Sequence, residues 1–375
     1  MGNGITLSSG VRQNLLSLQD IAQLTSITQN RLASGKKVNS ALDNAVNYFT
    51  AAGLDSRATD LNALLDAMSN AIQTVSAANN GIDSITKTVQ QMQATLMQAR
   101  QDASWQSTSY TFSVAATGKT IGFAGGATGT TTAITVSLDT AGAIDTVDQA
   151  VSAINANTSL TGKVKASNDA GTLRIQNLST SSLTVTGGAS GVVDGSTNTD
   201  SIGGNTSRNN LVTQFNLLRD QLDKTAADSS FNGVNLLQGD ALKLFFNELS
   251  TSSITVQSTN VNGISNTVLG ITAGSASEFE TNTQLDTRLQ SLHNALTQVA
   301  SQASGFGSNL SIVQNRQNFT TQMINTLQTG ADGLTLADTN LEGANMLALQ
   351  TRQQLSITAL SIASQQQSAV MRLFG

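Results

Sequence analysis

Several residue types that build reactive or metal-binding sites are missing from this chain of 375 residues. It has no cysteine, which excludes disulfides, thiolate catalysis and cysteine-ligated zinc. It has no proline, so no X–Pro isomerisation slows folding and no proline breaks a long helix from within. The only histidine, His293, is expected to be exposed and not to be a ligand. We therefore expect no metal and no cofactor.

Charge is scarce too, at 11% of residues against about 25% in an ordinary soluble protein. Ser, Thr, Asn and Gln take its place, and another molecule can cover these side chains without desolvating a charge. We interpret the composition as that of a surface that other subunits mostly cover. The alternative is a weakly charged extracellular protein, which explains the middle of the chain better than its ends.

Further absences argue against other classes of function. A net charge of −5 without a basic run argues against nucleic acid, and no apolar run is long enough to insert in a membrane. Residues 1–20 lack the basic and apolar regions of a Sec-type signal peptide. HExxH, P-loop and GxSxG motifs are absent, and the carboxylates of Asp145 and Asp148 are expected to be solvated. We therefore do not expect an enzyme.

A heptad stripe over residues 285–327 predicts a long helix with one seam facing a partner helix. Its steps alternate between four and three: Leu285, Leu289, Leu292, Leu296, Val299, Ala303, Phe306, Leu310, Val313, Gln317, Thr320, Ile324 and Leu327. Gly305 and Gly307 interrupt it and suggest a bend. An intramolecular coiled coil without further role is the alternative to a surface for partners.

Three other segments share the helical period. Residues 41–101 repeat an apolar side chain every seven residues, with Leu65 and Ile72 on the neighbouring seam position. A helix over residues 5–32 should end at Gly35. After an expected hinge at residues 329–333, a last helix over 334–374 is apolar on more than one face, so it needs another surface to bury it.

The middle of the chain differs in composition. Residues 106–205 are rich in Gly, Thr and Ser, and their alternating runs at 134–138, 173–175 and 183–185 predict short strands. Ile144, Val147, Val151 and Ile154 predict one short helix between them. Helical period resumes at Leu211, and strands are expected at 231–233, 254–256 and 268–271, with Asn-Gly turns at 232–233 and 262–263.

The predicted fold is therefore mainly α with a β insertion. Long antiparallel coiled-coil-like rods come from both chain ends, and a small β-rich domain is inserted mid-chain. We divide the chain into an N-terminal helical part (1–40), a rod helix (41–105), the insertion (106–205), a second rod region (206–328) and a C-terminal helical part (329–375). The residues expected to pack helices and to drive polymerisation are Val11, Leu15, Leu18, Leu61, Met68, Val75, Ile82, Val89, Leu96, Leu289, Leu296, Leu310, Leu341, Leu355, Ile362 and Leu373.

Several motifs resemble those of one known family. Residues 31–45, RLASGKKVNSALDNA, resemble the bacterial flagellin segment RLSSGxRINSAxDDAA. Residues 231–234 are similar to its FNGV turn, 314–316 to its QNR stretch and 370–374 to its C-terminus. Order and spacing agree over residues 1–105 and 206–375. The pattern at 136–138, 154–155, 166 and 168–173 resembles a small insertion motif of flagellins and hook-associated proteins.

The resemblance implies a filament. Its terminal helices would form an inner tube, its rods an outer tube and its insertion a surface projection. It also implies export, unfolded and without a cleaved signal peptide, through the flagellar type III apparatus to an extracellular filament. The implied partners are further copies of the chain, a flagellar export chaperone, a filament cap and junction proteins.

One segment departs from the family. Many flagellins carry LQRVREL, which an animal Toll-like receptor binds, whereas this chain has VQQMQAT at residues 89–95. Gln90, Gln91, Gln93 and Ala94 lie in this segment, so charge-assisted contacts would be lost there. We expect weak stimulation of that receptor. Two alternatives to a filament subunit are a hook–filament junction protein and a secreted coiled-coil adhesin that binds through 106–205. An enzyme hidden in the insertion is a third alternative.

Overall fold

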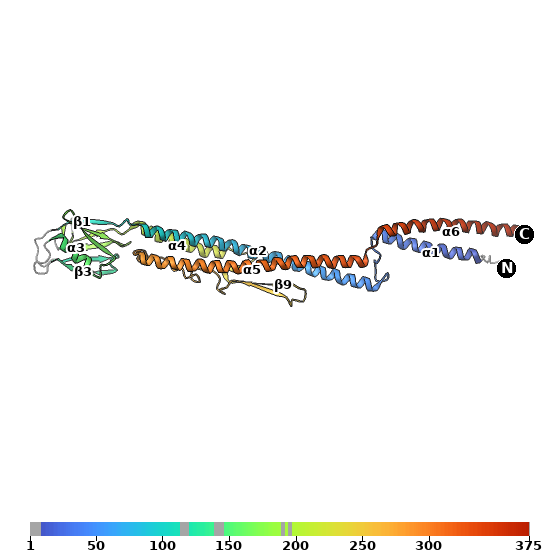
Figure 1. The fold of residues 1–375 in the computed structure, drawn as a ribbon, viewed down its shortest axis with the longest axis horizontal. Coiled ribbons are helices and arrows are strands. Elements are labelled where there is room, and N and C mark those ends of the chain that lie inside the picture. Colours follow the sequence, from blue (N-terminus) through green and yellow to red (C-terminus); the bar gives the residue numbers. More distant parts are fainter. Residues whose placement is uncertain (1–8, 113–119, 139–145, 189–191, 194–196, 375) are drawn as a thin grey trace. The chain divides into compact units, whose positions relative to one another are not determined.

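The computed structural model describes residues 9–112, 120–138, 146–188, 192–193 and 197–374 (Figure 1). Its helices are α1 (Ser9–Ser34), α2 (Ala45–Gln101), α3 (Val147–Ala156), α4 (Thr206–Asp228), α5 (Asn282–Thr335) and α6 (Thr339–Phe374), with short 3-10 turns at Leu236–Gln238 and Ala276–Phe279. The strands are β1 (Ser107–Phe112), β2 (Thr120–Gly125), β3 (Thr130–Ser137), β4 (Val164–Asp169), β5 (Thr172–Asn177), β6 (Leu183–Thr186), β7 (Val192–Val193), β8 (Thr199–Ile202), β9 (Ala241–Phe245) and β10 (Ser253–Gln257). The mainly helical fold with a mid-chain β insertion is confirmed.

The chain folds into two compact units. Unit 1 comprises residues 1–69, 245–253 and 314–375, and unit 2 comprises residues 70–244 and 254–313. Helices α2 and α5 therefore each contribute to both units. The five-part division expected from the sequence stays a prediction.

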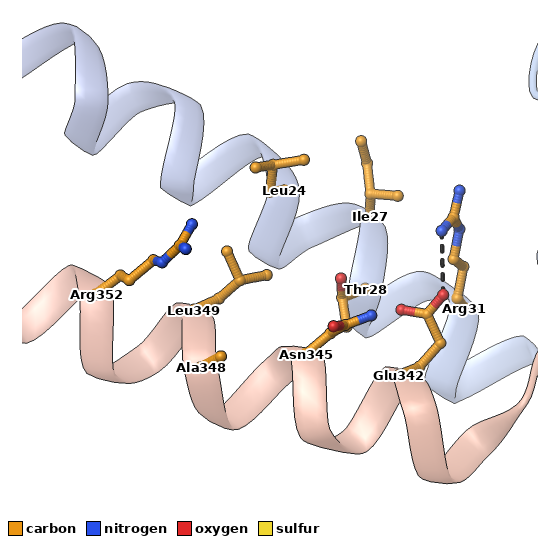
Figure 2. A pocket seen from close by; sticks show the side chains of 9 residues that line it. All are labelled: Leu24, Ile27, Thr28, Arg31, Glu342, Asn345, Ala348, Leu349 and Arg352. Atoms are coloured by element: carbon orange, nitrogen blue, oxygen red, sulfur yellow. Dashed lines mark hydrogen bonds and ion pairs between the residues drawn. The ribbon is translucent and has the colours of Figure 1, made fainter.

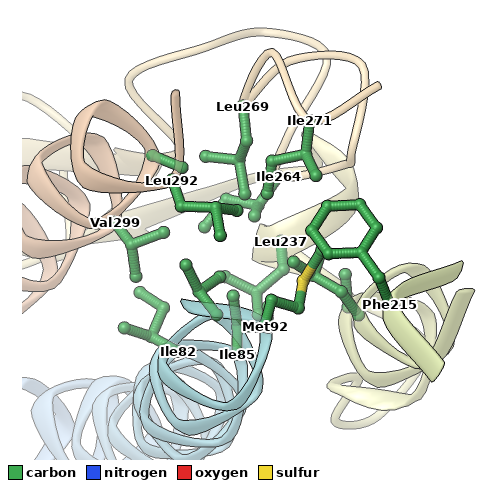
Figure 3. Close-up of a cluster of buried hydrophobic side chains, with 14 of the residues drawn as sticks. Ile82, Ile85, Met92, Phe215, Leu237, Ile264, Leu269, Ile271, Leu292 and Val299 are labelled. Atoms are coloured by element: carbon green, nitrogen blue, oxygen red, sulfur yellow. The ribbon is translucent and has the colours of Figure 1, made fainter. Parts of the chain in front are cut away.

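The helical core of unit 2 lies between α2, α4 and α5 (Figure 3). Ile82, Ile85 and Met92 of α2 belong to it together with Phe215 of α4, whose ring packs edge-on against Phe279 with centroids 5.8 Å apart. Leu292 and Val299 of α5 complete the core. It also includes four residues from the connections between helices: Leu237, Ile264, Leu269 and Ile271. This core includes side chains separated by about two hundred positions, so neither rod helix is stable by its own propensity alone.

The insertion, also in unit 2, has two four-stranded sheets. One has the order β4-β5-β1-β7 and the other β3-β2-β6-β8, and α3 packs against β3, β4 and β5. Its buried side chains form a separate apolar core around Tyr110, Phe123 and Ile154. Tyr110 donates a hydrogen bond to Asp200 Oδ2 at 2.9 Å, and burial together with this bond raises its pKa.

Most elements expected in this region are confirmed. The runs at 134–138, 173–175 and 183–185 fall on β3, β5 and β6, and the short helix is α3. Ile144, which began that pattern, and Asp145 lie outside the described residues. The Asn-Gly step at 232–233 forms a turn with φ of +50° and +79°, closed by a bridge between Phe231 and Val234. No strand runs through 231–233.

Two other predictions were wrong. Residues 268–271 form a turn, because the Leu269 and Ile271 N–H groups donate to the Ser265 and Asn266 carbonyls, and Gly270 has a φ of +70°. The hinge expected at 329–333 is helical, since α5 continues to Thr335 through Gly330 and Gly333. α5 also continues through Gly305 and Gly307, and the bend suggested there stays a prediction. The break lies at residues 336–338, where Leu336 bridges to Lys36.

Candidate assembly surface

The heptad residues of α2 lie inside the chain and not on its surface. Leu61, Met68, Val75, Ile82, Val89 and Leu96 are all buried. In unit 2 they belong to the core shared with α4 and α5, and in unit 1 Leu61 packs with Ala58, Ile324 and Leu327. These side chains pack the helices of one copy together, and their effect on polymerisation stays a prediction.

The deeply buried seam of α5 is part of the predicted heptad stripe, but three residues that we singled out for packing lie on the neighbouring seam. Leu289, Leu296 and Leu310 are only half-buried. The deeply buried series repeats every seven residues from Leu285: Leu285, Leu292, Val299, Phe306, Val313, Thr320 and Leu327. In α2 the missed seam is Ala71, Ala78, Ile85, Met92 and Ala99, whereas Leu65 and Ile72 are half-buried. Alanines at this seam give a weak hydrophobic signal, which is why the period alone did not find it.

Helices α1 and α6 lie against each other in unit 1 and leave much apolar surface uncovered. Val11 is buried and Leu18 half-buried, but Leu15, Leu341, Leu355 and Ile362 are exposed. Leu373 belongs to α6, and its side chain lies outside the described residues. Further exposed apolar side chains on the two helices are Leu16, Leu24, Ile27, Leu347 and Ile357. Exposed apolar side chains in this number on two paired helices indicate an interaction surface.

A groove of about 380 Å³ runs between these two helices (Figure 2). Leu24, Ile27 and Thr28 of α1 line it together with Asn345, Ala348 and Leu349 of α6. At one end Arg31 Nη1 donates to Glu342 Oε1 at 3.1 Å, and Arg352 lies at the other end. Among the described residues, no ion pair holds Arg352.

The connection from α1 to α2 is held by backbone and side-chain hydrogen bonds. Gly35 ends α1 with a φ of +68°, which glycine adopts without strain. Lys37 N–H donates to the Thr335 carbonyl at 2.8 Å, and Ala337 N–H donates to the Gly35 carbonyl at 2.9 Å. Asp43 Oδ2 accepts from the N–H groups of Asn39 and Ser40, both at 2.9 Å. The backbone bonds from Ser40 and Asn39 lower the pKa of Asp43, so its carboxylate stays charged and orders the turn.

The segment aligned with the receptor site lies on α2. Gln90, Gln91 and Ala94 are exposed, and Gln93 is half-buried. His293 is exposed on α5, as expected. The described residues contain no group of three His, Cys, Asp or Glu that could hold a metal ion. Of the helices in the described part of the chain, none has the length and apolar character needed to cross a membrane.

Comparison with known proteins agrees with these features. Residues 8–113 match the bacterial flagellin N-terminal helical region, and residues 289–374 match the bacterial flagellin C-terminal helical region. The chain is 33% identical over 170 residues to flagellin FljM of Caulobacter vibrioides, covering 44% of this chain and 59% of that protein. It is 26% identical over 404 residues to flagellin A of Rhizobium meliloti, covering 96% of each. The chain thus spans about three fifths of the Caulobacter relatives that it matches.

Proposed function

The chain belongs to the bacterial flagellin family, and from this premise we propose that it is a structural subunit that polymerises into the extracellular filament of a flagellum for swimming motility. The observation that carries the proposal is the apolar surface on α1 and α6, which nothing else in the described chain covers. Burying one leucine side chain completely contributes about 1.5–3 kcal/mol. Each copy exposes several such side chains, so burying them between copies provides a driving force for association.

Export and partners follow as parts of the same proposal. The subunit leaves the cell through the flagellar type III apparatus without a cleaved signal peptide. An export chaperone covers the apolar face of α6 before export, and the filament cap and junction proteins contact the assembled ends. The exposed leucines of α6 support this order, because an unassembled helix with such a surface would aggregate.

Polymerisation of the purified full-length chain tests the proposal. Seeds of sheared filament should elongate, and variants lacking residues 9–34 or 339–374 should fail to add while keeping the unit 2 fold. A hook–filament junction protein would add one layer to a seed and stop. A chain that stays monomeric at high concentration and high salt, or whose trimmed variants elongate seeds as well as the intact chain, would contradict the proposal.

A separate expectation concerns the segment of α2 that aligns with the receptor-binding segment of other flagellins. Gln90, Gln91 and Ala94 present no charge to solvent, so an arginine- or carboxylate-dependent contact cannot form there. We expect the monomer to stimulate Toll-like receptor reporter cells at least tenfold less than an enteric flagellin. Placing the family residues back at these positions should raise the response. Equal stimulation by the unaltered chain would refute the expectation.

A further inference from the structure

Three strongly exposed apolar side chains lie close together in sequence, in the turn before α2 and in its first turns. Leu42 is 97% exposed, Val46 75% and Phe49 65%. Val46 and Phe49 lie three residues apart on one side of the first turns of α2, and Leu42 lies in the turn just before the helix. We call these three side chains the knob. Its position is fixed, because the turn before α2 is held by the Asp43 hydrogen bonds to Asn39 and Ser40.

The groove between α1 and α6 offers a surface of matching chemistry. Leu24, Ile27, Ala348 and Leu349 give it apolar walls, and its volume of about 380 Å³ suits several aliphatic or aromatic side chains. Leu24 and Ile27 are half or nearly half exposed, so the groove is open to a partner. The knob and the groove are different surfaces, and every copy of the chain has both.

Charge selects the orientation. Arg352 lies at one end of the groove and forms no ion pair in the described chain. Asp43 stands next to Leu42 in the turn that carries the knob, and its carboxylate stays charged. A knob that enters the groove with Asp43 toward Arg352 pairs these charges, whereas the reverse orientation places Asp43 at the Arg31–Glu342 ion pair, whose charges are already matched.

We propose that the knob of one copy seats in the α1–α6 groove of a second copy, with Asp43 of the first beside Arg352 of the second. The inference rests on the proposed assembly function and specifies one of its contacts. Because one copy gives its knob and the next gives its groove, the contact is heterologous and repeats head to tail without closing. A repeated contact of this kind extends a filament.

Cross-linking between two single-cysteine chains tests the contact, since the natural chain has no cysteine. One full-length chain, labelled with ¹⁵N, carries Val46→Cys in the knob, and an unlabelled chain carries Leu24→Cys in the groove. The two are polymerised as an equal mixture, oxidised mildly and analysed by mass spectrometry. We expect the mixed disulfide in large excess over either homodimer. As the control, a Leu217→Cys chain replaces the Val46→Cys chain. Leu217 lies on α4 and is similarly exposed, and the yield of mixed disulfide should be at least tenfold lower.

A second change separates a real contact from chance collision. Phe49→Asp in the Val46→Cys chain should lower the mixed disulfide at least tenfold, while Thr50→Asp, one exposed residue further, should leave it unchanged. Filaments without the mixed disulfide would overturn the knob contact and leave the proposed function standing. A mixed disulfide between soluble chains that never elongate seeds would support the contact and contradict the filament. Homodimers as abundant as the mixed product would overturn a head-to-tail contact.

Discussion

At the residue scale, one arginine joins the end of α2 to the start of α4. Arg208 Nη2 donates to the Asp102 carbonyl, and Nη1 donates to the carbonyls of Phe279 and Glu280, all at 2.9 Å. Its guanidinium lies over the Trp105 ring, 4.4 Å from the centroid. Burial lowers the pKa of Arg208, and the nearby Asp102 carboxylate opposes that effect. The charge is retained because these carbonyls replace water around it.

Asp102, beside Arg208, makes the free energy of unfolding depend on pH. Burial alone would raise the pKa of Asp102, but the hydrogen bonds from Asn205 and Ser104 and the charge of Arg208 together lower it. A carboxyl whose folded pKa is lowered stabilises the fold above its unfolded pKa of about 3.9, and this contribution is lost as pH falls through the folded value. Asp102→Asn should therefore destabilise the depolymerised chain near about pH 6 and much less near about pH 3.

Denaturant unfolding followed by the fluorescence of Trp105 measures this, because the chain has only one tryptophan and it lies at this position. Other carboxyl groups titrate in the unaltered chain and in the Asp102→Asn variant alike. The difference between their free energies of unfolding therefore isolates the contribution of Asp102. If Asp102→Asn lowered the free energy of unfolding equally at both pH values, the charge of the Asp102 carboxylate would not be what stabilises the fold.

At the element scale, the sequence predicted the helices better than their contacts. The seven-residue repeat located α2 and α5, since a buried seam imposes that period. It did not tell which of two neighbouring seams lies deeper, because Ala78 on the deeper seam of α2 gives a weaker hydrophobic signal than Leu65 on the other. It also missed Gln302, a polar residue that is buried in α5. Gln302 is buried because its Oε1 accepts from Thr259 N–H at 2.7 Å. A side-chain pattern cannot reveal such a loop contact.

Connections were predicted less well for a related reason. Gly330 and Gly333 favoured a hinge, yet α5 passes through both, since packing overrides a helix propensity loss of about 1 kcal/mol each. The break falls where the two connections are joined by backbone hydrogen bonds. Lys37 N–H donates to the Thr335 carbonyl, and Ala337 N–H donates to the Gly35 carbonyl. In the candidate assembly surface, the uncharged tails were evident from the sequence, whereas the groove required the pairing of α1 with α6 and the knob required the exposures at the start of α2.

Two glycines of α2 make a matched pair for testing the helix packing. A Cβ at Gly81 would lie 2.1 Å from Ser229 Oγ and 2.7 Å from Leu237 Cδ1, whereas one at Gly53 would meet nothing within 4 Å. Gly81→Ala should lower the free energy of unfolding by about 1–2 kcal/mol, because overpacking of about 1–3 kcal/mol exceeds the gain in helix propensity. Gly53→Ala should raise it by about 0.5–1 kcal/mol.

Urea unfolding of the depolymerised chains, followed by circular dichroism, compares the two substitutions. The helix is the same and the residue change is the same, so propensity contributes equally. If Gly81→Ala were as stabilising as Gly53→Ala, α2 would not approach Ser229 and Leu237 as closely as described.

At the scale of the whole molecule, the insertion leaves and rejoins the helices at one place. A Cβ at Gly203 would lie 3.9 Å from Gln106 Cγ, and Asn177 N–H donates to the Gln106 carbonyl at 2.9 Å. The insertion has its own apolar core, separate from that of the helices. A chain that leaves a fold and returns to the same point can lose the intervening domain without opening the rest.

Removing residues 107–202 and joining Gln106 to Gly203 through a short Gly/Ser linker should therefore preserve assembly. The junction keeps Asp102, Asn205 and Arg208, so the end of α2 stays bonded to the start of α4. It loses the Ser179 and Thr180 contacts to Glu280 and Ala276, which should lower stability modestly. We expect the shortened chain to elongate seeds at a rate within about threefold of the intact chain, a difference of less than 1 kcal/mol. An adhesin that binds through this domain would instead lose its binding, and failure of the shortened, folded chain to elongate would place the assembly contacts in the insertion and not at the chain ends.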